Sequence, residues 1–401
     1  MKTHFPSGLV LAGVLFLNCS HVALAQDCSV SIHVEVPPGT GPVYLAGNCP
    51  ELGDWNARGL RLSGTNTDRT TTIRVAKGTS LEFKVTLGSW DHEALDTQGR
   101  IPPNHKIQVD GNQDISLTVP SFRQGIAEYM ADWRGSGVQG TLIYWTNVTS
   151  KFLRSPRPVE IWLPPDYDAH STNRYDVIYM HDGQNLFDPR LASTGVDWGV
   201  DEAVMRCRKA GALPPVIVVG VWCTDQRLKE YSPWHLGTNY ARFLIEELMP
   251  RVNREFRTRT GPEHTAVMGS SMGGLISFWL CWRHPEVFGR AGCLSSSFGW
   301  HGQMTGQPAP EPYIERALAA GPAMRKGVRI YMDYGSGTPD GEDAALQERV
   351  AAWLGSQGLQ SGKDYTLRVF PGAQHTEAAW RTRLDTPLAF LYAGWKSGDE
   401  P

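Results

Sequence analysis

The sequence lacks most features of membrane, metal-binding and nucleic-acid-binding proteins. Only 20% of its 401 residues are charged, and the net charge of −3 comes with neither a basic stripe nor an acidic tail, so no nucleic-acid partner is expected. It has no C-x-x-C pair and no histidine cluster at zinc spacing, so neither a metal nor another cofactor is expected. Beyond residue 25 no apolar run is long enough to cross a membrane. The hydrophobic content of 41% is that of a globular protein, and the length favours two to three domains.

The first 25 residues have the pattern of a secretory signal peptide. Lys2 precedes an apolar run over residues 9–17 that is too short to span a bilayer, and Ala23-Leu24-Ala25 forms a cleavage signal. A lipid anchor on Cys19 is the alternative, but Asn18 stands where a small residue would be expected. We therefore expect residues 1–25 to be removed and the mature protein to be secreted or periplasmic.

Cysteine is also scarce, with seven residues in the whole chain, of which Cys19 falls in the predicted signal peptide. An even number of cysteines in an exported protein favours disulfide bonds, and six cysteines allow 15 pairings. The simplest arrangement joins neighbours in the sequence, which predicts the pairs Cys28–Cys49, Cys207–Cys223 and Cys281–Cys293.

Alternating apolar and polar residues recur between residues 26 and 120, with no convincing helix among them. Short strands at this spacing, separated by turn residues, are typical of a small β-sandwich. The alternating stretches are residues 30–36, 71–75, 81–87 and 115–119.

Within this segment, two stretches resemble the starch-binding type of carbohydrate-binding module. They are Val43-Tyr44-Leu45-Ala46-Gly47-Asn48 followed by Leu52-Gly53-Asp54-Trp55-Asn56, and Phe83-Lys84-Val85-Thr86 with Gly88-Ser89-Trp90. The resemblance implies a glycan-binding face that includes Trp90 and Lys84. The tryptophan usual at the start of the middle strand is replaced by Thr70-Thr71-Thr72. Core packing is the alternative for Trp90, and it is the expectation for Trp55.

Residues 121–137 predict a linker, and strands then alternate with helices from 138 to 401. Strands are expected at residues 140–145, 159–163, 176–180 and 215–221, and helices at 201–209 and 240–256. The alternation predicts an α/β fold with a doubly wound, mainly parallel sheet, preceded by the all-β sandwich. Sheets of this kind place active sites at the carboxyl ends of their strands.

One such strand end carries a serine in a tight turn. An apolar run ends in Gly269-Ser270-Ser271-Met272-Gly273, which fits G-x-S-x-G, and an apolar helical pattern follows at once. This order of strand, turn and helix is the context of a nucleophile elbow, which presents the hydroxyl of Ser271 above the sheet. The backbone N–H of Met272 is then one donor of an oxyanion hole.

A second strand end supplies the other donor. The buried strand at residues 176–180 is followed by His181-Asp182-Gly183-Gln184, where the glycine lets a backbone N–H point into a site above the sheet. We expect the N–H of Gln184 to complete the oxyanion hole.

A serine nucleophile needs a histidine base, and the histidine needs a carboxylate. His375 follows the predicted strand at residues 366–370, at the right place for the base. The acid should follow the strand at residues 328–332, and Asp340 is preferred because it lies far enough into the loop to reach back to the histidine. The other candidates for the acid are Asp333, Glu342 and Asp343.

From about residue 138 to 395 the chain resembles the putative-esterase family of α/β-hydrolases, which includes enterochelin-type siderophore esterases and feruloyl esterases. The resemblance is carried by Tyr179-Met180-His181-Asp182-Gly183-Gln184, Gly269-Ser270-Ser271-Met272-Gly273-Gly274, and Pro371-Gly372-Ala373-Gln374-His375 with Trp380. It implies a serine carboxyl-ester hydrolase. Substrate choice is expected to depend on Asp182, Arg227 and Trp300. Arg227 either binds an acidic or catechol-like group or pairs with Glu230.

The sequence thus predicts an exported esterase that forms an acyl-enzyme on Ser271 and acts on feruloyl- or catechol-type esters, either free or linked to polysaccharide. A siderophore lactone esterase and an acyltransferase are the enzymatic alternatives. The remaining alternative is an inert protein that binds glycans or serves as a scaffold.

Overall fold

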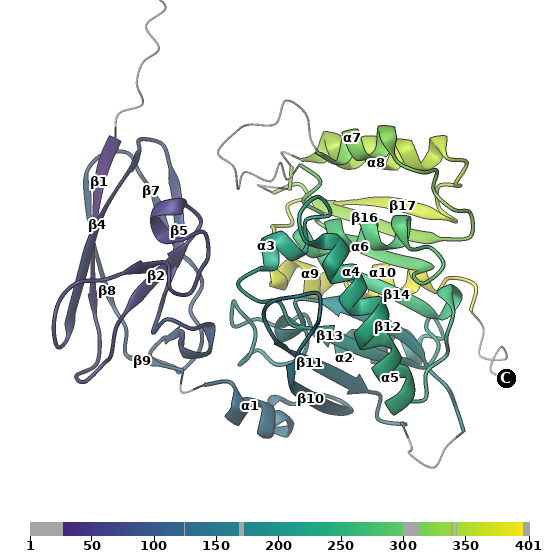
Figure 1. Cartoon of the computed structure of the whole chain (residues 1–401), viewed down its shortest axis with the longest axis horizontal. Coiled ribbons are helices and arrows are strands. Elements are labelled where there is room, and N and C mark those ends of the chain that lie inside the picture. The colour runs from purple at the N-terminus through teal and green to yellow at the C-terminus, as the bar shows by residue number, and fades with distance from the viewer. Residues whose placement is uncertain are drawn as a thin grey trace, which may run out of the picture.

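The computed structural model describes residues 27–123, 125–167, 172–299, 313–337, 340–341 and 343–395. The predicted signal peptide, Trp300 and Glu342 lie outside these residues. An amino-terminal β-rich part is followed by an α/β part that holds the large sheet (Figure 1).

The amino-terminal part is built from two main sheets that pack face to face. One sheet has the order β4-β1-β8 and the other β3-β2-β5-β7, and a short β6–β9 pair adjoins them. The strands are β1 (Asp27–Glu35), β2 (Tyr44–Gly47), β3 (Leu60–Arg61), β4 (Asp68–Ala76), β5 (Ser80–Thr86), β6 (Ala94–Leu95), β7 (His105–Gln108), β8 (Gln113–Thr118) and β9 (Ser121–Phe122), with short 3₁₀ helices η1 (Pro50–Leu52) and η2 (Trp90–His92).

The alternation seen in the sequence fills the space between these sheets. Val30, Ile32 and Val34 of β1 point inward with Leu81 and Phe83 of β5, while the residues between them face solvent. The expectation that Trp55 belongs to this core is wrong, because its side chain is only partly buried and lies outside the buried cluster.

The carboxy-terminal part contains an eight-stranded sheet of order β10-β11-β13-β12-β14-β15-β16-β17. β10, β11 and β13 pair antiparallel, and all later pairings are parallel. The predicted doubly wound, mainly parallel sheet after a β-sandwich is thus confirmed. The strands are β10 (Thr141–Val148), β11 (Arg157–Leu163), β12 (Asp176–His181), β13 (Val216–Val221), β14 (Thr265–Ser270), β15 (Arg290–Leu294), β16 (Arg329–Gly335) and β17 (Tyr365–Phe370).

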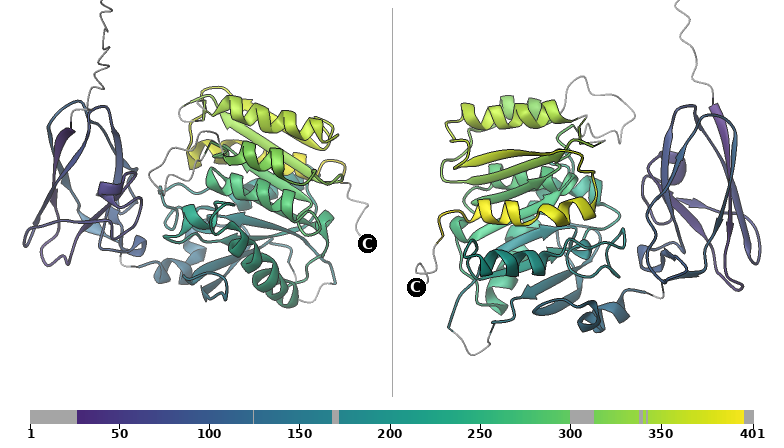
Figure 2. Two further views of the ribbon diagram at one scale, coloured as in Figure 1. Left: turned by 45° about the horizontal axis from the view of Figure 1, so that its top comes forward. Right: turned by 180° about the vertical axis from the view of Figure 1, so that it is seen from behind.

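Helices cover both faces of this sheet (Figures 1 and 2). Those on one face are α4 (Gly237–Arg242), the π-helical η5 (Phe243–Leu248), α5 (Met249–Glu255), α6 (Met272–Arg283), α7 (Tyr313–Ala320) and α8 (Ala344–Ser356). Those on the other face are α2 (Val200–Lys209), α9 (Glu377–Arg383) and α10 (Asp385–Leu391). Shorter elements are α1 (Ala127–Ala131), η3 (Trp133–Ser136), η4 (Gly183–Asn185), α3 (Arg227–Glu230) and η6 (Pro262–His264). In the described part of the chain, no helix is both long and apolar enough to cross a membrane.

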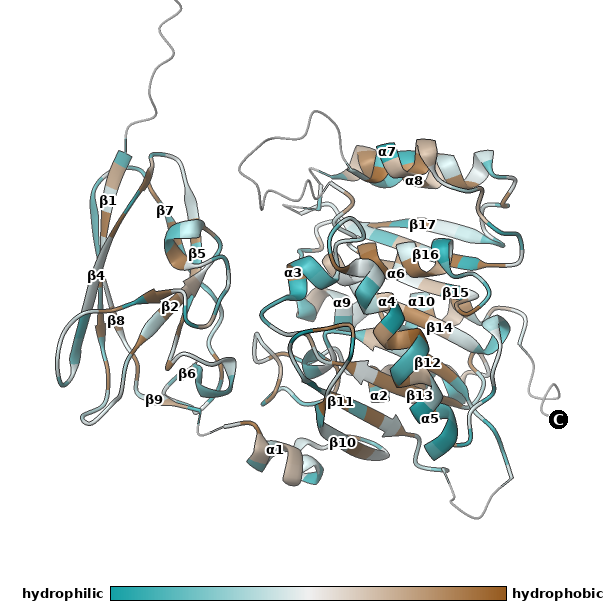
Figure 3. Ribbon diagram, in the orientation of Figure 1, coloured by the Kyte–Doolittle hydropathy of each residue, from teal (hydrophilic) through white to brown (hydrophobic). Residues whose placement is uncertain are grey.

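Burial on both faces explains why the central strands are apolar without alternation. In β12, Val177 and Tyr179 join the core under α4 to α6, whereas Ile178 and Met180 join the core under α2 and α10. The hydropathy colours show the central strands as brown arrows between helices that are teal on their outer sides (Figure 3).

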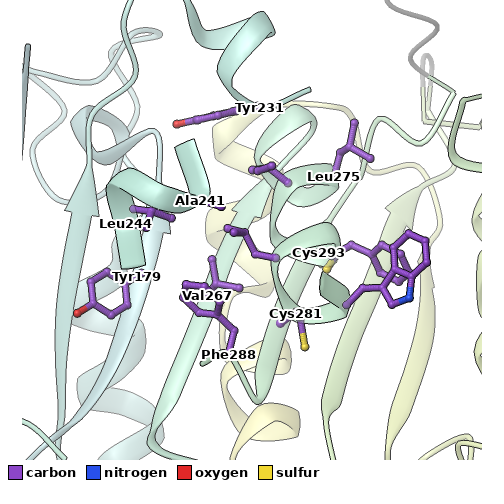
Figure 4. Packing of buried hydrophobic residues seen from close by; sticks show 14 of the residues in the cluster. Tyr179, Tyr231, Ala241, Leu244, Val267, Leu275, Cys281, Phe288 and Cys293 are labelled. Carbon is purple, nitrogen blue, oxygen red and sulfur yellow. The ribbon is translucent and has the colours of Figure 1, made fainter. Parts of the chain in front are cut away.

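The three predicted disulfides are wrong. Cys49, Cys207, Cys223, Cys281 and Cys293 carry free thiols. Cys207 on α2 hydrogen-bonds through Sγ to the carbonyl of Asp385, and Cys223 contacts Gln184, so these thiols face different neighbours. Cys281 and Cys293 behave as small apolar residues in the core between α6 and β15, where Figure 4 shows them among Val267 and Phe288.

Candidate active site

Ser271 lies at a sharp turn between β14 and α6. Its backbone has φ 57° and ψ −124°, a strained conformation for a residue with a β-carbon. The glycines of the motif allow the turn, since a β-carbon on Gly269 would lie 2.9 Å from the backbone carbon of Gly273. The strain and the crowding explain why G-x-S-x-G is needed here.

The loop after β12 lies directly beside this elbow. β12 and β14 are neighbours, with Met180 opposite Met268, so the chain leaves both strands at the same edge of the sheet. A β-carbon on Gly273 would lie 3.3 Å from Cβ of His181 and 3.5 Å from Oδ2 of Asp182. The start of α6 and the start of η4 are therefore in close contact.

Two backbone donors are available at these helix starts. The first helical bond of α6 runs from Leu275 N to Ser271 O, so the N–H of Met272 has no acceptor within the helix. The first bond of η4 runs from Asn185 N to Asp182 O, which likewise leaves the N–H of Gln184 without a helical acceptor. Two such donors at adjoining helix starts are the groups from which an oxyanion hole is built.

His375 and Asp340 come together from two further strand ends. His375 follows β17, Asp340 follows β16, and a short hydrogen bond joins His375 Nδ1 to Asp340 Oδ1. The imidazole also meets the indole of Trp380 edge to face, with ring centroids 5.0 Å apart. These two contacts hold the ring through Nδ1 and the Trp380 indole, which leaves Nε2 for another partner.

The other described carboxylates that the sequence offered as partners for His375 do not contact it. Asp333 is fully buried within β16, where Arg383 contacts both its oxygens at 2.9 and 3.1 Å and Tyr331 donates to it at 2.9 Å. Asp343 lies at the start of α8. Of the described candidates, Asp340 is the one bonded to His375.

Asp340 is held by groups that the sequence did not single out. Ser295, just after β15, donates its hydroxyl to Asp340 Oδ2 at 2.5 Å, and the N–H of Gly335 donates to the same oxygen at 2.9 Å. Burial raises the pKa of Asp340, but hydrogen bonds from His375, Ser295 and Gly335 outweigh it, so the pKa is lower than usual. The carboxylate is thus stabilised in its charged form.

The Ser295 hydroxyl is itself an acceptor for two donors. Trp380 Nε1 reaches its oxygen at 3.0 Å and Arg383 Nη2 at 2.8 Å. With both lone pairs occupied, the single Ser295 proton can only point to Asp340. Ser295 also has φ 41°, so its backbone is strained to bring the hydroxyl there. Its place just after a strand end is a signal in the sequence that points to it.

The hydroxyl of Ser271 is hydrogen-bonded to that of Ser297 at 3.0 Å. Ser297 belongs to the same loop as Ser295 and also donates its N–H to the carbonyl of Ser271. The loop after β15 therefore touches both Ser271 and Asp340.

Asp182 and Arg227 form a two-bond ion pair at 2.7 and 2.8 Å on the opposite side of the elbow. The predicted alternative, in which Arg227 pairs with Glu230, is wrong because Glu230 binds Arg157 at 2.7 and 2.8 Å. Burial raises the pKa of Asp182, but Arg227 opposes it more strongly, so that pKa is below its usual value.

The side chain of Gln184 is tied back to Cys223. Gln184 Nε2 donates to Cys223 Sγ at 2.9 Å, and the N–H of Cys223 donates to Gln184 Oε1 at 3.3 Å. Burial, helped by the charge of Asp182, raises the pKa of the Cys223 thiol to about 12. The thiol is therefore protonated and acts as part of the support of the loop.

His181 is buried beneath the same loop. Its Nδ1 lies 2.9 Å from the hydroxyl of Tyr240, and Tyr231 accepts the N–H of Asp182 at 3.1 Å. Burial lowers the pKa of His181 to about 3, so the imidazole is neutral at physiological pH.

The two predicted glycan contacts differ in exposure. Trp90 in η2 is partly buried, and its carbonyl accepts a hydrogen bond from Arg123 at 2.5 Å. Lys84 is 5% exposed, and its ammonium is bound by Glu93 at 2.7 Å and by the carbonyls of Pro102 and Ser193 at 2.8 Å. The ammonium is thus held by two carbonyls and an ion pair in a buried position, so it is not open to a sugar.

Comparison with known proteins agrees with both parts of the fold. The family described as "Putative esterase" matches residues 150–391, and the "Starch binding domain" matches residues 28–118. The chain is 25% identical over 256 residues to "Uncharacterized protein YbbA" of Bacillus subtilis (strain 168), which covers 59% of this chain and 92% of that protein. It is 22% identical over 295 residues to an endo-1,4-beta-xylanase/feruloyl esterase of Xylanibacter ruminicola, covering 73% of this chain and 36% of that protein.

Solved structures of similar fold include two esterases. A ferulic acid esterase aligns with a TM-score of 0.50 and 20% identity, covering 64% of this chain and 98% of its own. The enterochelin esterase from Shigella flexneri aligns with a TM-score of 0.51 and 17% identity, covering 92% of this chain and 94% of its own. With the family match spanning most of the α/β part, the chain belongs to the esterase family, as a carboxylic ester hydrolase that carries an amino-terminal domain of the starch-binding type.

Proposed function

We propose that the protein is a serine esterase in which Ser271, His375 and Asp340 form the catalytic triad. The observation that carries the proposal is the hydrogen bond between His375 Nδ1 and Asp340 Oδ1, at the sheet edge where the Ser271 elbow also lies. A carboxylate bonded to Nδ1 fixes the tautomer in which Nε2 accepts a proton. Membership of an esterase family supports the same assignment.

In the proposed reaction, His375 Nε2 takes the proton of Ser271 as its Oγ attacks the carbonyl carbon of the ester. For this the Ser271 hydroxyl exchanges its hydrogen bond to Ser297 for one to His375. The imidazolium, stabilised by Asp340, then gives its proton to the oxygen of the leaving alcohol or phenol. Water attacks the acyl-enzyme by the same route, which releases the acid and restores the serine.

The negative oxygen of the tetrahedral intermediate is bound in this proposal by the N–H groups of Met272 and Gln184. Each donor of this kind is worth about 3–4 kcal/mol in the transition state. No step needs a cofactor.

Aromatic esters of the feruloyl or catechol type are the proposed substrates. The name of the Xylanibacter ruminicola relative includes a feruloyl esterase, and that match extends over 73% of this chain. The ion pair of Asp182 with Arg227, whose side chain is 28% exposed, offers a polar wall for the hydroxyl groups of such a ring. Trp300, the third predicted substrate contact, lies outside the described residues.

A substrate panel on the purified protein tests this proposal. Methyl ferulate, a catechol lactone and an alkyl p-nitrophenyl ester are compared, with Ser271→Ala as the blank. Preference for methyl ferulate, abolished in Ser271→Ala, is the expected result. Preference for the lactone indicates the siderophore alternative, and acyl transfer to an added sugar acceptor indicates the acyltransferase. Undiminished hydrolysis by Ser271→Ala contradicts the triad, and no turnover of any ester favours the inert alternative.

Export is also part of the proposal, supported by Lys2, the apolar run at residues 9–17 and Ala23-Leu24-Ala25. Amino-terminal sequencing of the protein recovered from outside the cytoplasm is expected to begin at Gln26. Recovery of the uncleaved chain from the cytoplasm contradicts it.

For the amino-terminal domain we propose glycan contact through Trp90, supported by the match to the starch-binding family. Lys84 is not included, because it is buried. Affinity electrophoresis in soluble starch should retard the wild type more than Trp90→Ala, and equal mobility of both proteins in starch and in plain gel contradicts the contact.

A further inference from the structure

The loop at residues 188–199, here called the bridge loop, contacts the β-sandwich and the active site at once. On the β-sandwich side, Lys84 Nζ donates to the carbonyl of Ser193 at 2.8 Å, and Arg123 Nη1 donates to that of Arg190 at 3.0 Å. A β-carbon on Gly195 would lie 2.7 Å from the carbonyl oxygen of Ile101, so the two backbones touch. The bridge loop is thus bound to the β-sandwich along much of its length.

The other side of the bridge loop holds the loop at residues 182–186, which carries Gln184 and is here called the oxyanion loop. The N–H of Ser193 donates to Asn185 Oδ1 at 2.8 Å, and the N–H of Trp198 donates to the carbonyl of Asn185 at 2.8 Å. Asn185 is buried and follows Gln184 directly. The carbonyl of Ser193 therefore accepts a hydrogen bond from Lys84, while its N–H donates to Asn185, the residue after the proposed oxyanion donor Gln184.

The bridge loop also reaches the helix that follows His375. Thr194 Oγ1 lies 3.1 Å from Glu377 Oε2. Arg381 on the same helix contacts Asp197 and, at 2.9 Å, Glu202. A displacement of the bridge loop would consequently shift both the loop that carries Gln184 and the helix α9 that follows His375.

Lys84 is one of two buried cations that bind the bridge loop, and Arg123 is the other. Burying an ammonium is unfavourable unless it is paired and hydrogen-bonded, and here it pairs with Glu93 and donates to the carbonyls of Pro102 and Ser193. Only one of the three, Ser193, lies outside the β-sandwich. The ammonium thus holds the carbonyl of Ser193, the point of the bridge loop that also binds Asn185.

We infer that Lys84 is a positioning residue for ester hydrolysis: through Ser193 and Asn185, the β-sandwich holds the oxyanion loop in its reactive geometry. The inference rests on the proposed function of Ser271 and Gln184. It assigns the starch-binding-type domain a role in the rate of the reaction on every ester, including esters too small to contact that domain.

The test compares Lys84→Met with Lys106→Met in the full-length protein. Lys106 lies on the same sheet and pairs with Glu82 at 2.8 Å, but its side chain is 69% exposed. With p-nitrophenyl acetate, Lys84→Met should lower kcat by about 10- to 100-fold, the range for a small misplacement of catalytic groups, with KM within about twofold of the wild type. Lys106→Met should match the wild type. A wild-type kcat in folded Lys84→Met overturns the inference.

Asn185→Ala removes the hydrogen bond that links Ser193 to the oxyanion loop. It therefore tests the same connection if Lys84→Met does not fold. It should lower kcat by a similar factor. In the double variant, Lys84→Met should lower kcat by less than about a further twofold, because both changes interrupt the same chain of contacts. A wild-type kcat in Asn185→Ala, or losses that simply multiply in the double variant, overturns the inference.

Hydrogen exchange separates this inference from the proposed function. Lys84→Met should exchange faster than Lys106→Met over residues 183–199, with α6 unchanged. Faster exchange confined to the β-sandwich overturns the inference even when Ser271→Ala proves inactive. Faster exchange at residues 183–199 supports the positional link even if Ser271→Ala retains activity and the triad proposal fails.

Discussion

Ser295 donates its hydroxyl proton to Asp340 at 2.5 Å, on the carboxylate oxygen opposite the one that binds His375. Because Trp380 and Arg383 occupy the other side of the Ser295 oxygen, the proton has one direction available. Ser295 therefore orients Asp340 much as Asp340 orients His375.

Replacing Ser295 by alanine should lower kcat about 10- to 100-fold, the equivalent of one hydrogen bond to a charged group. Loss of that bond also raises the pKa of Asp340, so the acidic limb of the pH–rate profile should move to higher pH. Ser296→Ala is the matched control, since the buried Ser296 hydroxyl has no hydrogen-bond partner among the described residues. Equal kcat and equal pH profiles for the two variants would contradict this role.

The two buried aspartates near β16 should respond differently to loss of charge. Asp340→Asn should lower kcat about 10³- to 10⁴-fold with little change in stability, because it disturbs the His375 tautomer. Asp333→Asn leaves the buried Arg383 without its carboxylate and should cost about 3–5 kcal/mol of unfolding free energy. Steady-state kinetics and urea unfolding of both variants check this, and the reverse pattern would assign the acid to Asp333.

Gly183 is expected to tolerate no side chain. A β-carbon there would lie 2.6 Å from the backbone carbon of Gly220 and 2.7 Å from Trp222, so Gly183→Ala must displace the loop that carries Gln184. The loss of one oxyanion donor should lower kcat about 10²- to 10³-fold. Gly111→Ala, where no atom lies within 4 Å of the added carbon, is the control. Wild-type kcat in Gly183→Ala would show that this loop does not bind the oxyanion.

His181 should make the catalytic domain sensitive to acid. Its pKa is about 3 in the folded protein against an ordinary value of 6.5, so the unfolded chain binds the proton first as pH falls. The stability it contributes is complete above pH 6.5 and declines down to about pH 3, by about 1.4 kcal/mol per pH unit. Between pH 7 and pH 5, wild type should lose about 2 kcal/mol more than His181→Asn in urea unfolding. Equal losses would contradict the assignment.

The parts of the site that could be predicted from the sequence are those whose geometry depends on residues adjacent in the chain. The elbow at Ser271 was predictable because strand, turn and helix are consecutive, and the crowding of Gly269 on Gly273 is local. His375 was placed by its position just after a strand. The apolar central strands likewise predicted a sheet covered on both faces.

Contacts between distant segments could not be predicted. Ser295 and Asp340 are 45 residues apart, and Lys84 and Ser193 are 109 apart, so no spacing rule joins them. The disulfide prediction failed for the same reason. Counting cysteines gives no information on their geometry, and the thiols of Cys207 and Cys223 face Asp385 and Gln184.

Covalent labelling shows which serine is the nucleophile, and we expect it to be Ser271. A fluorophosphonate should modify wild type at one serine, and peptide mapping should place the adduct on Ser271. His375→Ala should react far more slowly, and Ser271→Ala should not react at all. An adduct on another serine, or the absence of labelling in an active wild-type preparation, would contradict the account.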